Sequence, residues 1–313
     1  MIGSFAPKDK GFALIAVIWI LVLLIMLALS FTKILRRESD LGRTVLTGFQ
    51  QQAFAASGIS VAKKMLTLPV GERWIPDGRI YSFNFQGSEI RVRVFSERGK
   101  INLNTVEEGL LDRVLMPAMA SADERQTLVQ AILDWRDSDE YRRLRGAEYK
   151  QYEQSGLRYR PNNSLFSSVQ QLQWVLGMSG VVYDYLRPLF TVWSKGNKVD
   201  RALASVDVLN GLEGPESHTV IDHYQQRILT VEEEGSTGQR RRGSDSNPED
   251  HYYTLIAQAK VGHQLSKGIE ALVKTDKAGP NKPAVHTIMW QETDASQSLF
   301  AAALDPLVVW YSL

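Results

Sequence analysis

The chain has 313 residues, more than one hydrophobic core usually serves, so we expect at least two packed units. Apolar residues make up 44% of the chain and charged residues 23%, and 36 Lys and Arg balance 35 Asp and Glu, which excludes a disordered or strongly basic protein. The absence of cysteine excludes a disulfide scaffold, a thiolate zinc site, an iron–sulfur centre and a cysteine nucleophile.

An apolar run over residues 12–31 contains no charge, proline or glycine and is long enough to cross a bilayer as a helix. Lys8 and Lys10 precede it and favour a cytoplasmic N-terminus, although three basic residues follow within 33–37. A cleaved secretory signal peptide is the alternative, but its apolar region spans only about 7–15 residues. An ordinary signal anchor stays open on this pattern alone.

The helical pattern continues beyond the apolar run as a narrower stripe. Apolar residues recur there at helical spacing: Leu41, Val45, Phe49, Ala53 and Ala56. We therefore predict one helix from Phe12 to about Leu66, ended by Pro69 and Gly71.

Strand patterns lie on both sides of a long helical region. Alternating runs at 80–85 and 89–95 flank Gln86-Gly87-Ser88 and predict a β-hairpin. Residues 101–246 are mainly amphipathic helix, so we predict a helical domain inserted into an α+β body. Further strands are predicted at 252–261, 268–275 and 284–292.

A weak sequence pattern recurs three times in the helical region. Thr105, Ser168 and Ser205 each precede an apolar helical pattern, which favours three helical hairpins with Ser or Thr as N-cap. The alternative is that any small helical domain contains such recurrences by chance. Gly235–Asp250 is predicted to be a flexible connector. The apolar C-terminal tail, 298–313, is too short for a second membrane anchor and is expected to pack on the body.

Acidic residues concentrate at the predicted end of one helix. Asp137, Asp139 and Glu148 occupy positions 1, 3 and 12 of an EF-hand-type spacing, and Asp134 lies on the same helical face as Asp137. The loop is not an EF-hand, because it lacks the glycine at position 6. Calcium suits such an irregular loop better than magnesium or zinc. The alternative is a solvated helix end whose acids pair with the arginines in 142–145.

No catalytic site emerges from the sequence. The five histidines are scattered, and the chain has no phosphate-binding loop, dinucleotide glycine pattern or Gly-x-Ser-x-Gly elbow. Residues 101–105 resemble the opening of helix-hairpin-helix modules in competence proteins, which makes a membrane-anchored DNA receptor the rival function. However, the turn at 116–120 lacks the glycine nest that holds phosphate, and residues 101–245 carry 17 Lys and Arg against 21 Asp and Glu. We therefore expect no nucleic-acid partner.

The N-terminal region resembles the prepilin signal of type IV pilins and type II secretion pseudopilins, in which a charged leader ends in glycine before a long apolar helix. In that family a prepilin peptidase cuts after the glycine and methylates the new N-terminus, which implies cleavage between Gly11 and Phe12. The family's usual glutamate at the fifth mature position is replaced by Ala16, as in the K-type minor pseudopilin. A lone carboxylate at membrane depth is costly, so its absence fits a subunit with no predecessor to dock onto.

A second series of motifs resembles the minor pseudopilin K family of type II secretion systems. The match covers roughly 12–192 and includes these segments in order: Gly99–Thr105, Asp134–Asp139, Gly146–Glu148, Leu176–Met178 and Leu186–Val192. The resemblance implies a pilin-like body with a large inserted α-domain that binds structural calcium through Asp134, Asp137, Asp139 and Glu148. The residues after Glu148 depart from the acidic and aromatic family pattern, which puts a second metal site in doubt.

The resemblance implies a fold of class α+β, with a long N-terminal helix on a small antiparallel sheet and an all-α domain inserted between strands. It implies a non-enzymatic, single-pass inner-membrane protein with its bulk in the periplasm, at the tip of a pseudopilus. The expected partners are I-type and J-type minor pseudopilins, the prepilin peptidase, the membrane and the inner-membrane secretion machinery; a type IV pilus minor pilin is the alternative. The expected divisions are a leader at 1–11, a transmembrane helix at 12–32, helix and first strands at 33–99, the insertion at 100–245, closing strands at 246–292 and a tail at 293–313.

Overall fold

The computed structural model describes residues 10–69, 71–213, 251–262, 264–276, 284–293 and 298–312. It divides into two compact units, the first ending at Ala53 and the second beginning at Phe54. The predicted connector Gly235–Asp250 lies outside the described residues, as do His218, His223 and His263.

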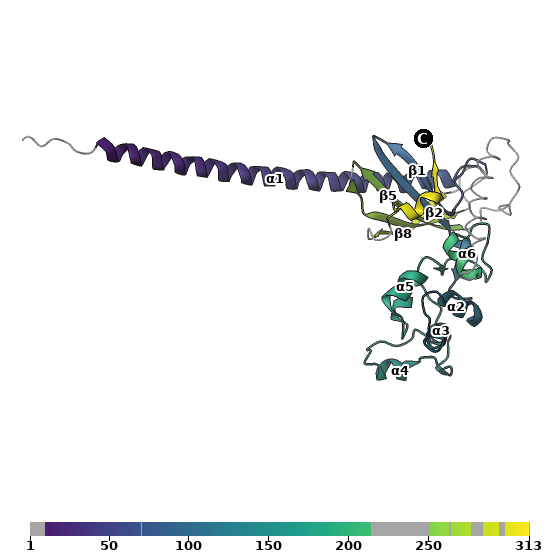
Figure 1. Cartoon of the computed structure of the whole chain (residues 1–313). Helices are drawn as coiled ribbons and strands as arrows, with labels where there is room; N and C mark the ends of the chain where they lie inside the picture. Colours follow the sequence, from purple (N-terminus) through teal and green to yellow (C-terminus); the bar gives the residue numbers. More distant parts are fainter. Residues whose placement is uncertain are drawn as a thin grey trace, which may run out of the picture. The chain divides into compact units, whose positions relative to one another are not determined.

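The predicted long N-terminal helix is confirmed. Helix α1 runs from Lys10 to Leu66, close to the predicted limits, and contains no proline (Figure 1). Its segment Leu14–Lys33 has a mean hydropathy of 3.1 and is not buried by the rest of the protein. By length and composition this segment is a candidate membrane span.

The second unit contains a seven-stranded sheet made by the described strands, in the order β8-β7-β5-β2-β1-β9, with β6 paired to β5. The predicted hairpin is confirmed by antiparallel pairing of β1 with β2. The closing strands are confirmed as β5, β7 and β8, which pair antiparallel in turn. The strands of this sheet are β1 Asp77–Phe85, β2 Ser88–Ser96, β5 His251–Val261, β6 Gln264–Leu265, β7 Gly268–Asp276, β8 Ala284–Thr293 and β9 Val308–Trp310.

One face of the sheet packs against the C-terminal end of α1. Ile59 and Ala62 of the helix are fully buried in one core with Val92 and Leu255 of the sheet. Gly58 allows the close approach, because a Cβ there would lie 2.9 Å from Ile90 Cγ2. This helix-on-sheet core agrees with the predicted α+β class.

The opposite face of the sheet is covered by the C-terminal segment, as expected for the apolar tail. Arg91 of β2 donates from Nη1 to the Leu299 carbonyl at 3.0 Å, and its guanidinium lies 4.5 Å from the Phe300 ring centroid. A 3-10 helix, η4 Ala302–Leu307, then leads into β9. Strand β9 pairs parallel with β1, so the sheet is mixed and not purely antiparallel as predicted.

The helical insertion lies between β2 and β5 and has its own core. Figure 1 shows helices α2 to α5 gathered away from the sheet, with α6 nearer to it. A parallel pair, β3 Ile101–Asn102 with β4 Phe190–Thr191, joins the start of the insertion to a segment that follows α5, so the insertion is not purely helical. The helices are α2 Glu108–Leu115, α3 Ala122–Arg136, α4 Tyr149–Gln154, α5 Gly180–Leu186 and α6 Val206–Glu213, with 3-10 helices η1 Glu97–Gly99 and η2 Val169–Trp174.

The three predicted N-caps have different outcomes. Ser205 caps α6, since its Oγ accepts from the Val208 N–H at 3.4 Å. Ser168 is the N-cap of η2, but its side chain makes no capping hydrogen bond. The Thr105 prediction is wrong: α2 starts later, after Glu107, and the Thr105 hydroxyl donates to the Gly196 carbonyl at 3.1 Å.

Candidate functional site

The predicted acidic cluster forms around the loop between α3 and α4. Helix α3 starts at its N-cap Ser121, whose Oγ accepts from the Glu124 N–H at 3.3 Å, and it ends at Arg136. Asp134 therefore lies in the last turn, and Asp137 is the C-cap. Glu148 is the N-cap of α4, so the loop returns a third carboxylate toward the end of α3.

Asp134 and Asp137 are brought together by Arg143. Nη1 of Arg143 donates to Asp134 Oδ1 at 2.7 Å and also contacts Asp137 Oδ2. The backbone N–H of Arg143 lies 3.2 Å from Asp134 Oδ2. Asp134 is fully buried; burial raises its pKa above the ordinary value, and the hydrogen bonds from Arg143 oppose that rise.

Glu148 is buried near this pair and is only partly satisfied. It is 6% exposed, and its Oε1 has no hydrogen-bond partner. Burial raises the pKa of Glu148 to about 7, and the negative charges of Asp134 and Asp137 add to the rise. Asp137 Oδ1 is also buried without a partner. The site thus holds more carboxylate oxygens than its single arginine satisfies.

Asp139, the fourth predicted ligand, lies at the exposed turn of the loop. Its Oδ1 accepts from the Tyr141 N–H at 2.8 Å, and its carbonyl accepts from Asn163 Nδ2 at 2.8 Å. Within the part of the chain that the structure describes, no group of three or more His, Asp or Glu side chains is arranged to hold a metal ion. The structure therefore places Asp134, Asp137 and Glu148 at the base of the loop and Asp139 farther out.

Gly146 fixes how closely the loop approaches Asp134. A Cβ at this position would lie 1.9 Å from Asp134 Oδ2, well inside van der Waals contact. The glycine is itself buried. The Gly-Ala-Glu motif at 146–148 thus has a steric reason for its first residue, which spacing alone did not reveal.

The other two loop arginines do not enter the acidic cluster. Arg142 Nε donates to the Gly146 carbonyl at 2.8 Å and closes the loop on itself. Arg145 pairs with the exposed Asp123. The sequence alternative of acid–arginine pairing is therefore found for one arginine, Arg143, with Asp134 and Asp137.

A small cavity of about 140 Å³ adjoins Glu148. Asn163 lines it, with a positive φ of 45°, and its Oδ1 is buried without a hydrogen-bond partner. Unpaired oxygens of Asp137, Glu148 and Asn163 are the donor atoms that calcium prefers. These atoms are of the kind that suits calcium, but the described acids are not gathered around one position, because Arg143 pairs with both Asp134 and Asp137.

The segment 101–105, at the start of the insertion, supports the fold of the insertion through its two asparagines. Asn102 Nδ2 donates to the Ser194 carbonyl at 2.7 Å, and Asn104 Nδ2 donates to the Phe166 carbonyl at 3.0 Å. Arg136 anchors the same segment by donating to the carbonyls of Leu103 at 2.6 Å and Val106 at 2.7 Å. The sequence did not indicate this role for Arg136, because its acceptors are backbone atoms.

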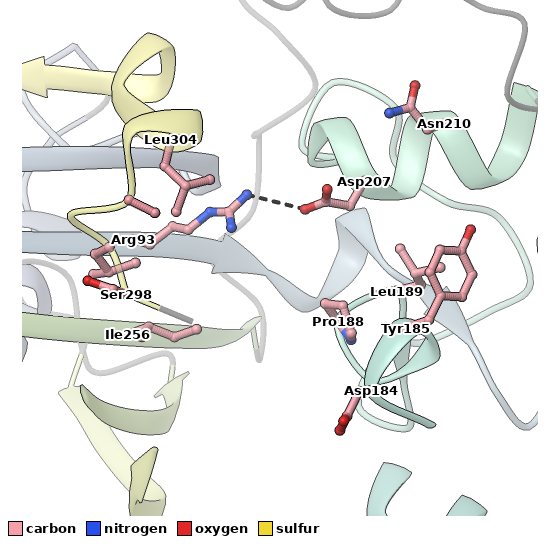
Figure 2. A pocket seen from close by; sticks show the side chains of 12 residues that line it. Arg93, Asp184, Tyr185, Pro188, Leu189, Asp207, Asn210, Ile256, Ser298 and Leu304 are labelled. Carbon is pink, nitrogen blue, oxygen red and sulfur yellow. Dashed lines mark hydrogen bonds and ion pairs between the residues drawn. The ribbon is translucent and has the colours of Figure 1, made fainter. Parts of the chain in front are cut away.

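A larger cavity of about 430 Å³ lies where the insertion meets the sheet. Figure 2 shows Arg93 of β2 on one side and Asp207 of α6 on the other, 3.3 Å apart between Nη2 and Oδ2. Leu304 of the C-terminal segment and Leu189 add apolar walls. A second link, between Arg187 and Glu270 of β7, also joins the insertion to the sheet. These two ion pairs, of which Arg93–Asp207 lines the cavity, connect the insertion to the sheet.

Comparison with known proteins places these features in a family context. A family model described as Type II secretion system (T2SS), protein K, matches residues 97–195. The type II secretion system protein K of Pectobacterium carotovorum subsp. carotovorum is 26% identical over 205 residues, which cover 58% of this chain and 62% of that protein. The protein of the same name from Klebsiella pneumoniae is 24% identical over 203 residues, with the same coverage of both chains.

A solved structure of the GspK-GspI-GspJ complex from enterotoxigenic Escherichia coli has a chain with 14% identity and a TM-score of 0.49, covering 83% of this chain and 99% of that chain. The match to each curated relative spans 62% of that relative's length. The region matched by the family model includes Arg143, Gly146 and the four acidic residues of the loop. The resemblance to protein K of the type II secretion system, predicted from the sequence motifs, is therefore confirmed.

Proposed function

We propose that this chain is a minor pseudopilin at the tip of the periplasmic pseudopilus of a type II secretion system. It acts by assembly and not by catalysis, and it supports pseudopilus formation and protein export across the outer membrane. The observation that carries the proposal is the match of the protein K model to 97–195, a segment that the fold inserts between neighbouring strands. A candidate membrane span in α1 supports the same reading.

The apolar part of α1 anchors the precursor once in the inner membrane, with the bulk of the chain in the periplasm. A prepilin peptidase cleaves between Gly11 and Phe12, followed by methylation of the new N-terminus. Gly11→Ala should leave a heavier, unassembled precursor on immunoblots. Gly48→Ala is the matched control, because nothing lies within 4 Å of a Cβ at that exposed helix position. Normal maturation of the Gly11 variant would instead favour an ordinary signal anchor.

The tip position follows from two features. Ala16 replaces the glutamate with which pseudopilins usually meet the subunit ahead, and the insertion is too bulky to be covered by another subunit. I-type and J-type minor pseudopilins are then direct partners. The exposed stripe of α1 is the natural contact surface, and Phe49 on it is 71% exposed.

This assignment is tested by co-purification of the full chain with I-type and J-type minor pseudopilins from detergent extracts. Phe49→Glu should abolish recovery of both partners, because it puts a charge into an apolar helix contact. The control Gln50→Glu introduces the same charge at the neighbouring exposed position and should leave recovery unchanged. Failure of the unaltered chain to recover either partner would refute the tip assignment.

We further propose that calcium binds at the base of the loop, with Asp134, Asp137, Asp139 and Glu148 as ligand candidates. Bound calcium would supply positive charge that offsets the mutual repulsion of these carboxylates. Chelation should lower the melting temperature of the full chain by roughly 5–10 °C, the effect of an ion at about 100 times its Kd. Asp137→Ala should remove that dependence, whereas Asp184→Ala, an exposed acid on α5, should keep it. An equal melting temperature with and without chelator would exclude a structural ion.

A further inference from the structure

Strand β8 forms an edge of the body sheet that no second described strand covers. It is the last strand in the order β8-β7-β5-β2-β1-β9, and among the strands that the structure describes it pairs with β7 alone. We infer that this edge is an interaction surface, on which an edge strand of a neighbouring minor pseudopilin pairs with β8 and extends the sheet. The inference rests on the proposed function and adds to it a second contact surface, separate from the exposed stripe of α1.

The first argument is the hydrogen-bonding capacity of the edge. Strand β8 has ten residues, Ala284–Thr293, which extend over roughly 33 Å. In an antiparallel ladder the backbone groups of alternate residues point toward the partner strand, so about half of the N–H and C=O groups of β8 face away from β7. An extended strand satisfies such a row of groups with its own backbone. The chemistry of the edge therefore suits a strand better than a helix.

The second argument is that β8 has few of the features that protect sheet edges in natural proteins. Protected edges are typically short, or they carry lysine or proline. The opposite edge fits this rule, because β9 has only three residues. Strand β8 is much longer and contains neither lysine nor proline. Its two ionisable side chains are paired within this chain, Glu292 with Lys267 and His286 with Asp276.

The third argument is that β8 exposes large apolar side chains. Ile288 and Trp290 are each 47% exposed. Ile288 has no partner residue in β7, because the register shifts there, and this bulge limits pairing locally. The regular ladder runs from Met289 to Thr293 and includes Trp290. An aromatic side chain favours cross-strand contacts, so this regular segment offers an incoming strand both backbone groups and an apolar neighbour.

The position of β8 beside α1 indicates which partner it meets. Lys63 of α1 donates from Nζ to Thr287 Oγ1 at 2.5 Å, and the same Nζ lies 5.9 Å from the Trp290 ring centroid. In the proposed function, α1 is the element through which this chain packs against other minor pseudopilins. A subunit that packs along the C-terminal part of α1 would lie close to β8. If that subunit has a body sheet of the same kind, it has an edge strand of its own to place there.

The main experiment is hydrogen–deuterium exchange, followed by mass spectrometry, on the full chain in detergent micelles. The chain is measured alone and in complex with the I-type and J-type minor pseudopilins. In the chain alone, β8 should exchange faster than the central strand β5, because its outward N–H groups are bonded to water. In the complex, exchange within 289–293 should slow by at least about tenfold. Equal protection of β8 and β5 in the chain alone would show that the edge is already covered, and would overturn the inference.

The second test is Trp290→Glu, which removes the aromatic contact and places a charge on the edge, where Lys63 can pair with it. The dissociation constant of the complex with the purified partners should rise about tenfold, because the charge would be buried against the incoming strand. The control Trp174→Glu makes the same change at a 55% exposed position of η2 in the insertion and should leave the dissociation constant unchanged. Equal dissociation constants for the two variants would contradict edge pairing.

The outcomes separate edge pairing from the proposed function. A complex that forms while exchange within 284–293 stays unchanged keeps the assembly role and refutes the edge pairing. If no complex forms with the unaltered chain, both proposals fail. Should Trp290→Glu lower the melting temperature, the exchange measurement on the unaltered chain decides the question without the variant.

Discussion

Gly146→Ala is the sharpest test of how the acidic loop is built. The added Cβ would meet Asp134 Oδ2 at 1.9 Å and Cγ at 2.7 Å, so either the carboxylate or the loop must move. Asp134 has no solvent-exposed surface into which it could rotate. Movement would also disturb its 2.7 Å bond to Arg143, the contact that compensates the buried charge.

The cost combines overpacking with a weakened buried ion pair. Overpacking costs about 1–3 kcal/mol, and complete loss of a buried pair costs about 3–5 kcal/mol. We expect the free energy of unfolding to fall by roughly 3 kcal/mol, less than the sum of the two costs, because the loop can relax partly. For a unit of this size that corresponds to a melting temperature lower by about 6–12 °C.

The assay is urea or thermal unfolding followed by tryptophan fluorescence. Gly109→Ala is the matched control: it lies in α2, no atom is within 4 Å of its would-be Cβ, and alanine favours the helix by about 0.5–1 kcal/mol. The control should be neutral or stabilising. Equal unfolding midpoints for the two variants would refute the steric argument for residue 146.

Three further predictions follow from contacts described above. The raised pKa of Glu148 means that the folded, metal-free protein binds a proton more tightly than the unfolded chain, so its unfolding free energy should fall as pH rises from about 4.5 to about 7, by up to roughly 3 kcal/mol. Glu148→Gln should remove this pH dependence of the unfolding free energy, measured by denaturant unfolding at several pH values in this range. An unchanged pH dependence would show that another group titrates. Arg136→Met leaves the Leu103 and Val106 carbonyls unpaired and should cost about 2–4 kcal/mol in urea unfolding, and a cost below 1 kcal/mol would mean that water replaces the guanidinium. Arg187→Met breaks a half-buried link between insertion and sheet and should increase proteolysis at the junction, whereas Lys267→Met, from an exposed pair, should not; equal cleavage would contradict a clamping role.

The regular elements could be predicted because their signals are local. The apolar periodicity of α1 and the alternation of β1 and β2 repeat over neighbouring residues, so a short stretch of sequence is enough to predict each element. Strand β9 could not be found in this way. Its pairing with Ile80–Ser82 of β1 joins segments from opposite ends of the second unit, and three residues are too few for a strand pattern.

The acidic site was predicted in composition but not in arrangement. The spacing pointed to these four acids, but it did not show that Asp134 is buried and that Asp139 is exposed. It could not tell that Arg143 turns inward while Arg145 turns outward, because backbone turns between α3 and α4 decide each direction. Distances between side chains that meet across a loop are not encoded in their separation along the chain.

Strands β2 and β5 are adjacent in the sheet although residues 97–250 separate them in the sequence. Closing so long a loop carries an entropy penalty, and pairing of distant segments slows folding. The β3–β4 pair reduces this penalty, because it joins residue 101 to residue 190 and so shortens the effective loop. We therefore expect the insertion to fold before the sheet is completed. The folding rate of the sheet would then depend on the insertion, although the insertion has a separate hydrophobic core.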